Sequence, residues 1–152
     1  MRTMAGVAVS LWLGVMGGFA FIVAPAAFAT LEREAAGRLV GAIFPRYYLV
    51  GVILGGLALV GLVGHWQGAG SRAWDWLGSG LVIVMVALTL YAWLVVLPAA
   101  HAAREAMRQA PAASAQAEGQ GFARLHRLST ILNGVVMLAG IGFLALDAAR
   151  RT

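Results

Sequence analysis

Hydrophobic residues along this chain gather into four long runs that contain no charged residue. The runs cover residues 5–29, 47–64, 77–100 and 128–146. A helix that crosses a bilayer needs about 20 largely apolar residues. Four uncharged runs of this kind cannot all be buried in the water-soluble core of a chain of 152 residues. The pattern therefore predicts an all-α, polytopic membrane protein, with residues 1–152 forming a single four-helix transmembrane domain.

Composition supports the same class and excludes several kinds of chemistry. Hydrophobic residues make up 61% of the chain and charged residues only 11%, against about 25% charged in a typical soluble domain. Cysteine is absent, which excludes disulfides, thiolate metal sites and thiol catalysis. All eleven basic residues are arginines, so a P-loop lysine and a Schiff base are excluded too. Because the arginines lie between apolar runs, the net charge of +5 indicates a bilayer with anionic lipid headgroups rather than nucleic acid as the partner.

The first run also has features of a secretory signal. Arg2 precedes it, and residues 27–29 read Ala-Phe-Ala, which resembles an Ala-x-Ala cleavage site. However, the run is longer than the roughly 7–15 apolar residues of a signal peptide. Five of its residues also fall on one helical face, as in a packed span: Ser10, Gly14, Gly17, Phe21 and Phe28. We therefore expect the mature protein to keep this segment as its first span.

Arginine counts predict the orientation. The segments between spans one and two and between spans three and four hold seven arginines together, whereas the termini and the remaining connection hold four. Cytoplasmic loops carry the excess of basic residues. We therefore expect a multi-pass protein of a bacterial-type inner membrane, with those two connections in the cytoplasm and both termini outside.

The two predicted cytoplasmic connections differ in kind. Residues 31–44 place apolar side chains at near-helical spacing, which predicts a short amphipathic helix in the membrane interface. Pro45 is predicted to end that helix, because the residue before a proline is biased away from helix. Residues 99–109 are expected to continue the third helix beyond the bilayer, and residues 111–121 read as an Ala/Gln/Gly/Ser linker.

The fourth run carries a polar stripe. His126, Ser129, Thr130 and Asn133 lie at i, i+3, i+4 and i+7, so they share one helical face. Lipid cannot satisfy such a stripe, which must therefore face protein or water. As a site, it would use His126 as a metal ligand, haem ligand or proton carrier and Asn133 as an orienting hydrogen-bonding group. The alternative is hydrogen bonding between helices, which we favour for Ser129 and Thr130, while His126 and Asn133 stay open between the two roles.

Further polar residues are predicted at the same membrane face. Arg46 precedes two tyrosines and could hold an anionic group together with Tyr48, or it could reach lipid phosphates while Tyr47 lies at the interface. His101, at the end of the third span, is a second metal-ligand candidate, with a solvated histidine as the alternative. No catalytic residue is predicted. The predicted ligand-binding set is Arg46, Tyr48, His126, Ser129 and Asn133.

Glycine spacing predicts close helix packing. Gly14 and Gly18, and likewise Gly51 and Gly55, form small-xxx-small faces. Such faces let helix backbones approach one another, either within the bundle or between two copies of the chain in a homo-oligomer.

Three ordered segments resemble a known family. They are Leu11-Trp12-Leu13-Gly14 with Ala24-Pro25, then Gly37-Arg38-Leu39-Val40-Gly41 with Phe44-Pro45-Arg46-Tyr47-Tyr48, then Leu125-His126-Arg127-Leu128-Ser129 with Asn133-Gly134. Together they resemble the transmembrane protein 205-like family, also known as domain of unknown function 4149. The resemblance implies a four-span integral membrane protein and no particular reaction. The segment order more faintly resembles haem-biosynthesis oxidases and copper-resistance membrane proteins, which use a histidine early in span one where this chain has Ser10 and Trp12.

Three hypotheses about function follow. No span has an ionisable residue at its middle, which argues against a carboxylate-based pump, and no nucleophile or carboxylate pair indicates an enzyme. The first hypothesis is a protein that binds or transports a small ligand through a polar pocket at the cytoplasmic face. The second is a structural or accessory membrane subunit without a ligand. The third is a redox protein with haem or a metal ion at His126 and His101; the first two need no cofactor.

Overall fold

The computed structural model describes residues 2–69, 73–111 and 115–149, and of residues 2, 65–69, 73–74 and 115–118 the backbone alone. Within these ranges the chain is helical and has no strand. In order, the elements are α1 (Arg2–Gly18), η1 (Phe19–Val23), α2 (Ala24–Thr30), α3 (Arg33–Ala69), α4 (Ala73–Tyr91), η2 (Ala92–Val96), α5 (Leu97–Gln109) and α6 (Ala115–Ala149). In this described part of the chain, four segments are long and apolar enough to cross a membrane: Thr3–Thr30, Arg33–Gly64, Asp75–Gln109 and Gly119–Ala149. The predicted all-α, four-span class is thereby confirmed.

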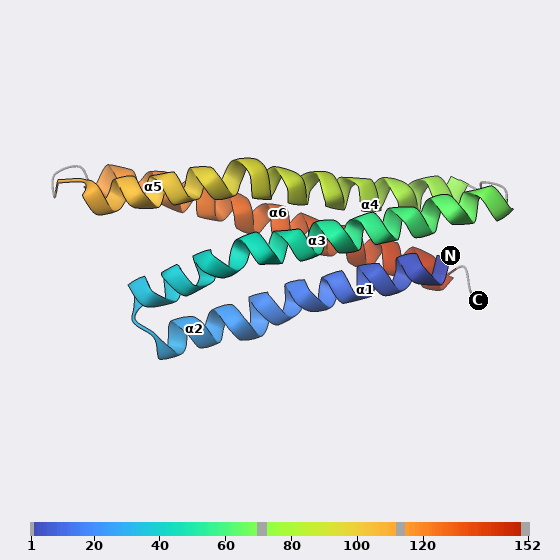
Figure 1. Cartoon of the computed structure of the whole chain (residues 1–152), viewed down its shortest axis with the longest axis horizontal. Helices are drawn as coiled ribbons and strands as arrows, with labels where there is room; N and C mark the ends of the chain where they lie inside the picture. Colours follow the sequence, from blue (N-terminus) through green and yellow to red (C-terminus); the bar gives the residue numbers. More distant parts are fainter. Residues whose placement is uncertain (1, 70–72, 112–114, 150–152) are drawn as a thin grey trace.

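The four apolar segments run antiparallel, each to the segment that precedes or follows it in the chain (Figure 1). The beginning of α1, the end of α3, the beginning of α4 and the end of α6 lie at one end of the bundle. The opposite end, which we call the distal end, consists of α2, the first turns of α3, α5 and the first turns of α6. At the distal end α2 packs against α3 and α5 packs against α6. The distal end is therefore built from two helix pairs.

The core of the bundle is centred on Trp12. This side chain is only 2% exposed and belongs to a buried cluster with Val9, Met16, Val82 and Met85. The predicted packing face of span one is wrong: Ser10 and Gly14 are exposed, Phe21 is 74% exposed and Phe28 is 51% exposed. Helical periodicity finds a face, but this face of α1 points away from the core, and the face with Ala8 and Trp12 points into it.

The two glycine pairs have different surroundings. A Cβ at Gly51 would lie 2.8 Å from Trp12 Nε1, and one at Gly55 would lie 2.9 Å from Trp12 Cζ3. Gly51 and Gly55 therefore let α3 approach α1, as predicted. A Cβ at Gly14 or Gly18 would meet nothing within 4 Å. The prediction that Gly14 and Gly18 let helices pack closely within the chain is therefore wrong. That this face packs between two copies of the chain stays a prediction.

The segment predicted to be a separate amphipathic helix is helical, but it is not separate. Residues 33–44 are the first turns of α3, which continues through Pro45 to Ala69. Proline removes one i→i−4 hydrogen bond, here to the Gly41 carbonyl. Proline within membrane helices is tolerated because neighbouring helices re-satisfy and hold the backbone. The predicted helix end at Pro45 is therefore wrong.

The third helix continues through α5 to Gln109, as predicted, but the predicted linker at 111–121 is wrong from Ala115 onward. Residues 115–121 form the first turns of α6. Alanine and glutamine are good helix formers, and α5 packs against α6, with Met107 Sδ 3.7 Å from where a Cβ at Gly119 would lie. These residues therefore form a helix although few of them are hydrophobic, because α6 has a packing partner on only one side here.

The two halves of the chain share an unusual feature. Each of spans one and three contains a π-helical turn, η1 and η2, closed by i→i−5 hydrogen bonds from Ala24 N–H to Phe19 O and from Leu97 N–H to Ala92 O. Each turn is followed by the same pattern, Pro-Ala-Ala-x-Ala, in which the variable residue is Phe28 or His101. This similarity, which the hydrophobic pattern does not show, indicates that the fold contains two similar helical hairpins.

Candidate functional site

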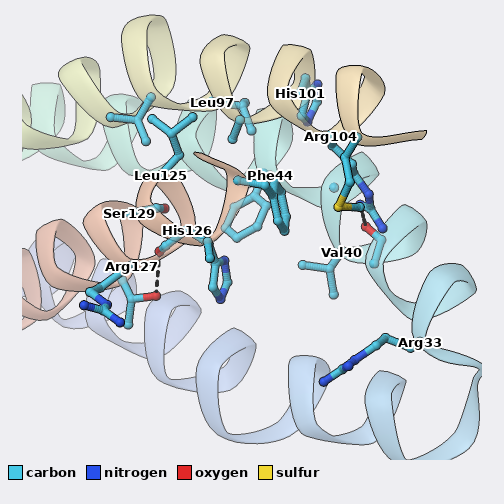
Figure 2. Close-up of a pocket in the computed structure, with 18 of the residues that line it drawn as sticks. Arg33, Val40, Phe44, Leu97, His101, Arg104, Leu125, His126, Arg127 and Ser129 are labelled. Atoms are coloured by element: carbon cyan, nitrogen blue, oxygen red, sulfur yellow. Dashed lines mark hydrogen bonds between the residues drawn. The ribbon is translucent and has the colours of Figure 1, made fainter. Parts of the chain in front are cut away.

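A pocket of about 810 Å³ lies at the distal end (Figure 2). Its walls come from both helix pairs: Phe28 of α2 and the first turns of α3 on one side, and η2, α5 and the first turns of α6 on the other. Pockets for small ligands commonly measure about 300–1,000 Å³. Phe28 and His101, the variable residues of the two similar hairpins, both line it. The pocket therefore lies where the two hairpins meet.

The polar lining of the pocket is cationic. Its basic residues are Arg33, Arg104, Arg127, His101 and His126. Among the residues whose side chains the structure describes, no aspartate or glutamate lines it. The nearby carboxylate of Glu34 instead accepts hydrogen bonds from Arg38 at 2.8 Å and Arg108 at 3.1 Å. The three arginines of the lining therefore offer their positive charge to an anion that enters the pocket.

Arg104 is held across the pocket from α5 to α3. Its Nη1 donates a hydrogen bond to the Gly37 carbonyl at 2.6 Å, and a Cβ at Gly37 would collide with its guanidinium. The Arg104 guanidinium carbon also lies 5.9 Å from the centre of the Phe122 ring. Phe122 in turn lies nearly parallel to the His126 ring, with centroids 6.2 Å apart. Arg104, Phe122 and His126 thus form one continuous wall.

The rest of the lining is apolar and aromatic. Phe44 stacks on Tyr48, with ring centroids 5.7 Å apart and an interplanar angle of 18°. Further apolar side chains complete the surface: Phe28, Val40, Val96, Leu97, Met107 and Leu125. The pocket therefore has two kinds of surface, a cationic one and a hydrophobic one, which suits an amphiphilic anion.

A hydrogen-bonded network closes the pocket on the side that faces the middle of the helix bundle. Tyr48, only 2% exposed, contacts Ser129 with 3.1 Å between the hydroxyl oxygens. Tyr47 Oη donates to Asn133 Oδ1 at 2.8 Å, and Asn133 Nδ2 donates to the Ser129 carbonyl at 2.9 Å and approaches Tyr48 Oη at 3.5 Å. The network joins α3 to α6. Asn133 and Tyr47 do not line the pocket.

The structure brings only part of the predicted site together. Tyr48, Ser129 and His126 line the pocket, Asn133 lies one turn deeper in the network, and Arg46 is exposed and donates to the Ala42 carbonyl of its own helix at 3.3 Å. The predicted bond of Ser129 to another helix is confirmed. The same prediction for Thr130 is wrong, since its hydroxyl donates to the His126 carbonyl on its own helix at 3.0 Å.

Sequence reasoning missed the three arginines that make the pocket cationic. Two of them lie close in sequence to the histidines that were proposed as ligands. Arg104 comes three residues after His101, and Arg127 directly follows His126. One helical turn places residues i and i+3 side by side, so Arg104 could have been grouped with His101. Arg33 begins α3 and had no such signal, because its approach to the pocket depends on how the helix pairs meet.

The two histidines come from different helices. His101 lies on α5 and His126 on α6, with His126 directed toward the α2 side of the pocket (Figure 2). Among the described residues, no group of three or more His, Cys, Asp or Glu side chains could hold a metal ion. A metal or haem, as in the third hypothesis, would therefore have to rely on one or two histidines of this lining.

The fold and the pocket define a multi-pass helical membrane protein whose four spans enclose a cationic pocket at one end. A family comparison agrees with this class. The chain belongs to the family described as Domain of unknown function (DUF4149), whose model matches residues 7–109, more than half of the chain.

One curated relative shows how much of its length this chain matches, but its name gives no function. The chain is similar to an uncharacterized protein of Aquifex aeolicus (strain VF5), with 46% identity over 50 residues. That match covers 33% of this chain and 38% of the relative, so the chain spans well under half of the relative's length. No solved structure matches the chain.

Proposed function

We propose that this protein binds, and in doing so carries or presents, a small anionic ligand in the pocket at the distal end. The observation that carries the proposal is the lining itself: three arginines and two histidines, with no carboxylate among the lining side chains that the structure describes. Uncompensated positive charge in a concave, partly apolar site favours an anion over water. As part of the proposal, this end lies on the cytoplasmic side of an inner membrane, which the excess of arginines in the two connections at this end supports. We also propose that the chain is a transmembrane protein 205-like protein, because the three ordered motifs named above resemble that family.

The second candidate is a structural or accessory subunit without a ligand. The Tyr47–Asn133 and Tyr48–Ser129 hydrogen bonds support it, because they show the polar stripe of α6 holding two helices together. They leave the cationic lining unexplained, however, since Arg33 and Arg127 lie outside that network. We therefore rank ligand binding first.

Phenyl phosphate should stabilise the detergent-purified protein. Its phosphate suits the guanidinium groups of Arg104 and Arg127, and its ring suits Phe44 and Phe122. A ligand that binds the folded state alone stabilises it by about 2.7 kcal/mol at a hundred times its Kd. We therefore expect Tm to rise with phenyl phosphate concentration, and not with phenol or with sodium chloride at matched ionic strength. Equal Tm values in all three titrations would favour the accessory-subunit role.

The haem hypothesis makes a separate prediction. We expect detergent-purified protein to show no Soret band, because binding of an anion by the lining arginines, as proposed, needs no haem. An absorption spectrum with elemental analysis measures this. A Soret band or a stoichiometric metal that disappears in His126→Ala would place the redox hypothesis first.

A further inference from the structure

The pocket is open on one side. Its lining residues on the flank between α2 and α6 are exposed, namely Phe28 at 51% and His126, Arg127 and Thr130. α2 makes its main contacts with α3, and α6 makes its own with α4 and α5. Figure 2 shows Arg33 and Arg127 on opposite sides of this flank, with His126 directed between them. The pocket therefore communicates sideways with the space between α2 and α6.

This opening lies at the ends of two apolar segments that are long enough to cross a bilayer, which is where headgroups meet the hydrocarbon around a spanning helix. Phe28 belongs to the last turn of the apolar segment Thr3–Thr30, and Arg127 lies in the early turns of Gly119–Ala149. Arginines at the ends of spans reach the phosphates of a bilayer. Below the opening, toward the membrane centre, apolar side chains point outward, such as Phe21 at 74% and Ile131 at 55% exposure.

We propose that the ligand is an acidic phospholipid that enters from the surrounding leaflet through this opening. The inference rests on the proposed function and names its ligand class. The phosphate lies among Arg33, Arg104 and Arg127, since guanidinium groups bind phosphate oxygens through paired, charge-assisted hydrogen bonds. The acyl chains leave the pocket between α2 and α6 and lie along Phe28 and Phe21. A soluble phosphate compound shares the headgroup chemistry but would leave the hydrophobic half of the lining and the lateral opening unused.

Native mass spectrometry of the full chain in a neutral detergent tests the lipid class with three probes. They are dioctanoyl phosphatidylglycerol, glycerol phosphate without acyl chains, and zwitterionic dioctanoyl phosphatidylcholine. We expect phosphatidylglycerol to bind at least tenfold more tightly than either of the other two. Equal affinity for glycerol phosphate would make the ligand a soluble anion, which overturns the lipid inference and leaves the proposed function standing. Equal affinity for phosphatidylcholine would also overturn it, because charge would then play no part.

Matched arginine variants on α6 test the location. Arg127 lines the pocket, whereas Arg124, one turn earlier and exposed, does not. We expect Arg127→Gln to weaken phosphatidylglycerol binding at least tenfold and Arg124→Gln less than twofold, although both remove one charge. Arg33→Gln, on α3, should repeat the loss if Arg127→Gln proves unstable. Equal losses at Arg124 and Arg127 would overturn the site. No binding of any probe, together with no Tm rise with phenyl phosphate, would overturn the proposed function as well.

Discussion

Leucine in place of Gly55 is expected to destabilise the protein more than any other single change considered for α3. Even a Cβ at this position would lie 2.5 Å from Val86 Cγ2 and 2.9 Å from Trp12 Cζ3. Trp12 is buried in the core and cannot move aside without opening its contacts. Overpacking a core commonly costs about 1–3 kcal/mol and occasionally more, and a side chain as large as leucine should reach the upper end. Tm in detergent measures the loss.

Gly56→Leu is the matched control for this prediction. A Cβ at Gly56 meets nothing within 4 Å, and the residue is exposed. Replacing a helical glycine there should be neutral or raise Tm, because glycine in a helix interior costs roughly 0.5–1 kcal/mol relative to alanine. Equal Tm losses for the two variants would show that α3 does not approach α1 at Gly55 as described.

Alanine in place of Asn133 is expected to lower stability while leaving the pocket functional. The substitution removes the acceptor of the Tyr47 hydroxyl and a donor that approaches Tyr48. Hydrogen bonds between membrane helices average about 0.6 kcal/mol with a maximum near 1.7, so the loss of both should cost about 1–2 kcal/mol. Because Asn133 does not line the pocket, phenyl phosphate affinity per folded molecule should stay within about twofold. The Tm measures the loss of stability, and a phenyl phosphate titration on the same sample measures the affinity.

Thr130→Ala serves as the stability control for Asn133. The Thr130 hydroxyl is exposed and bonds to a carbonyl of its own helix, so its loss should fall within about 0.5 kcal/mol, as for most surface changes. If Asn133→Ala keeps full stability but loses phenyl phosphate binding, then Asn133 is a binding residue and its role in the network is minor.

At the distal end, the hydrogen-bonded network and the pocket lie at different depths and are held by different contacts. Deeper in the bundle, Tyr48 and Asn133 tie α3 to α6. Farther out, contact between the two helix pairs depends on side chains that reach across, notably Arg104 to the Gly37 carbonyl and Arg108 to Glu34. The two π-helical turns lie beside this region, each shortly before a proline. Such turns are frequent at functional sites, which agrees with a site between the two hairpins.

The residues alone determined the class of this protein. Four uncharged apolar runs leave a chain of this length no soluble fold, and lipid forces each run into a helix because backbone groups must pair within the segment. The polar stripe of α6 was also evident from its spacing, since lipid cannot satisfy it. Ser129 and His126 were found in this way and line the pocket, as does Tyr48, which was proposed together with Arg46 on the preceding span.

Tertiary structure decided which face of each helix points inward and where the cationic residues meet. Along span one, the spacing predicted the face with Phe21 as the packed one, and only packing against α3 showed that Trp12 is buried and Phe21 is exposed. Pro45 is an end signal locally, but α3 continues through it because neighbouring helices hold the chain. Arg33, Arg104 and Arg127 are far apart in sequence and share a pocket because two helix pairs meet there. Such proximity depends on how the helices are placed relative to one another. The periodicity of a single helix gives no information about that placement.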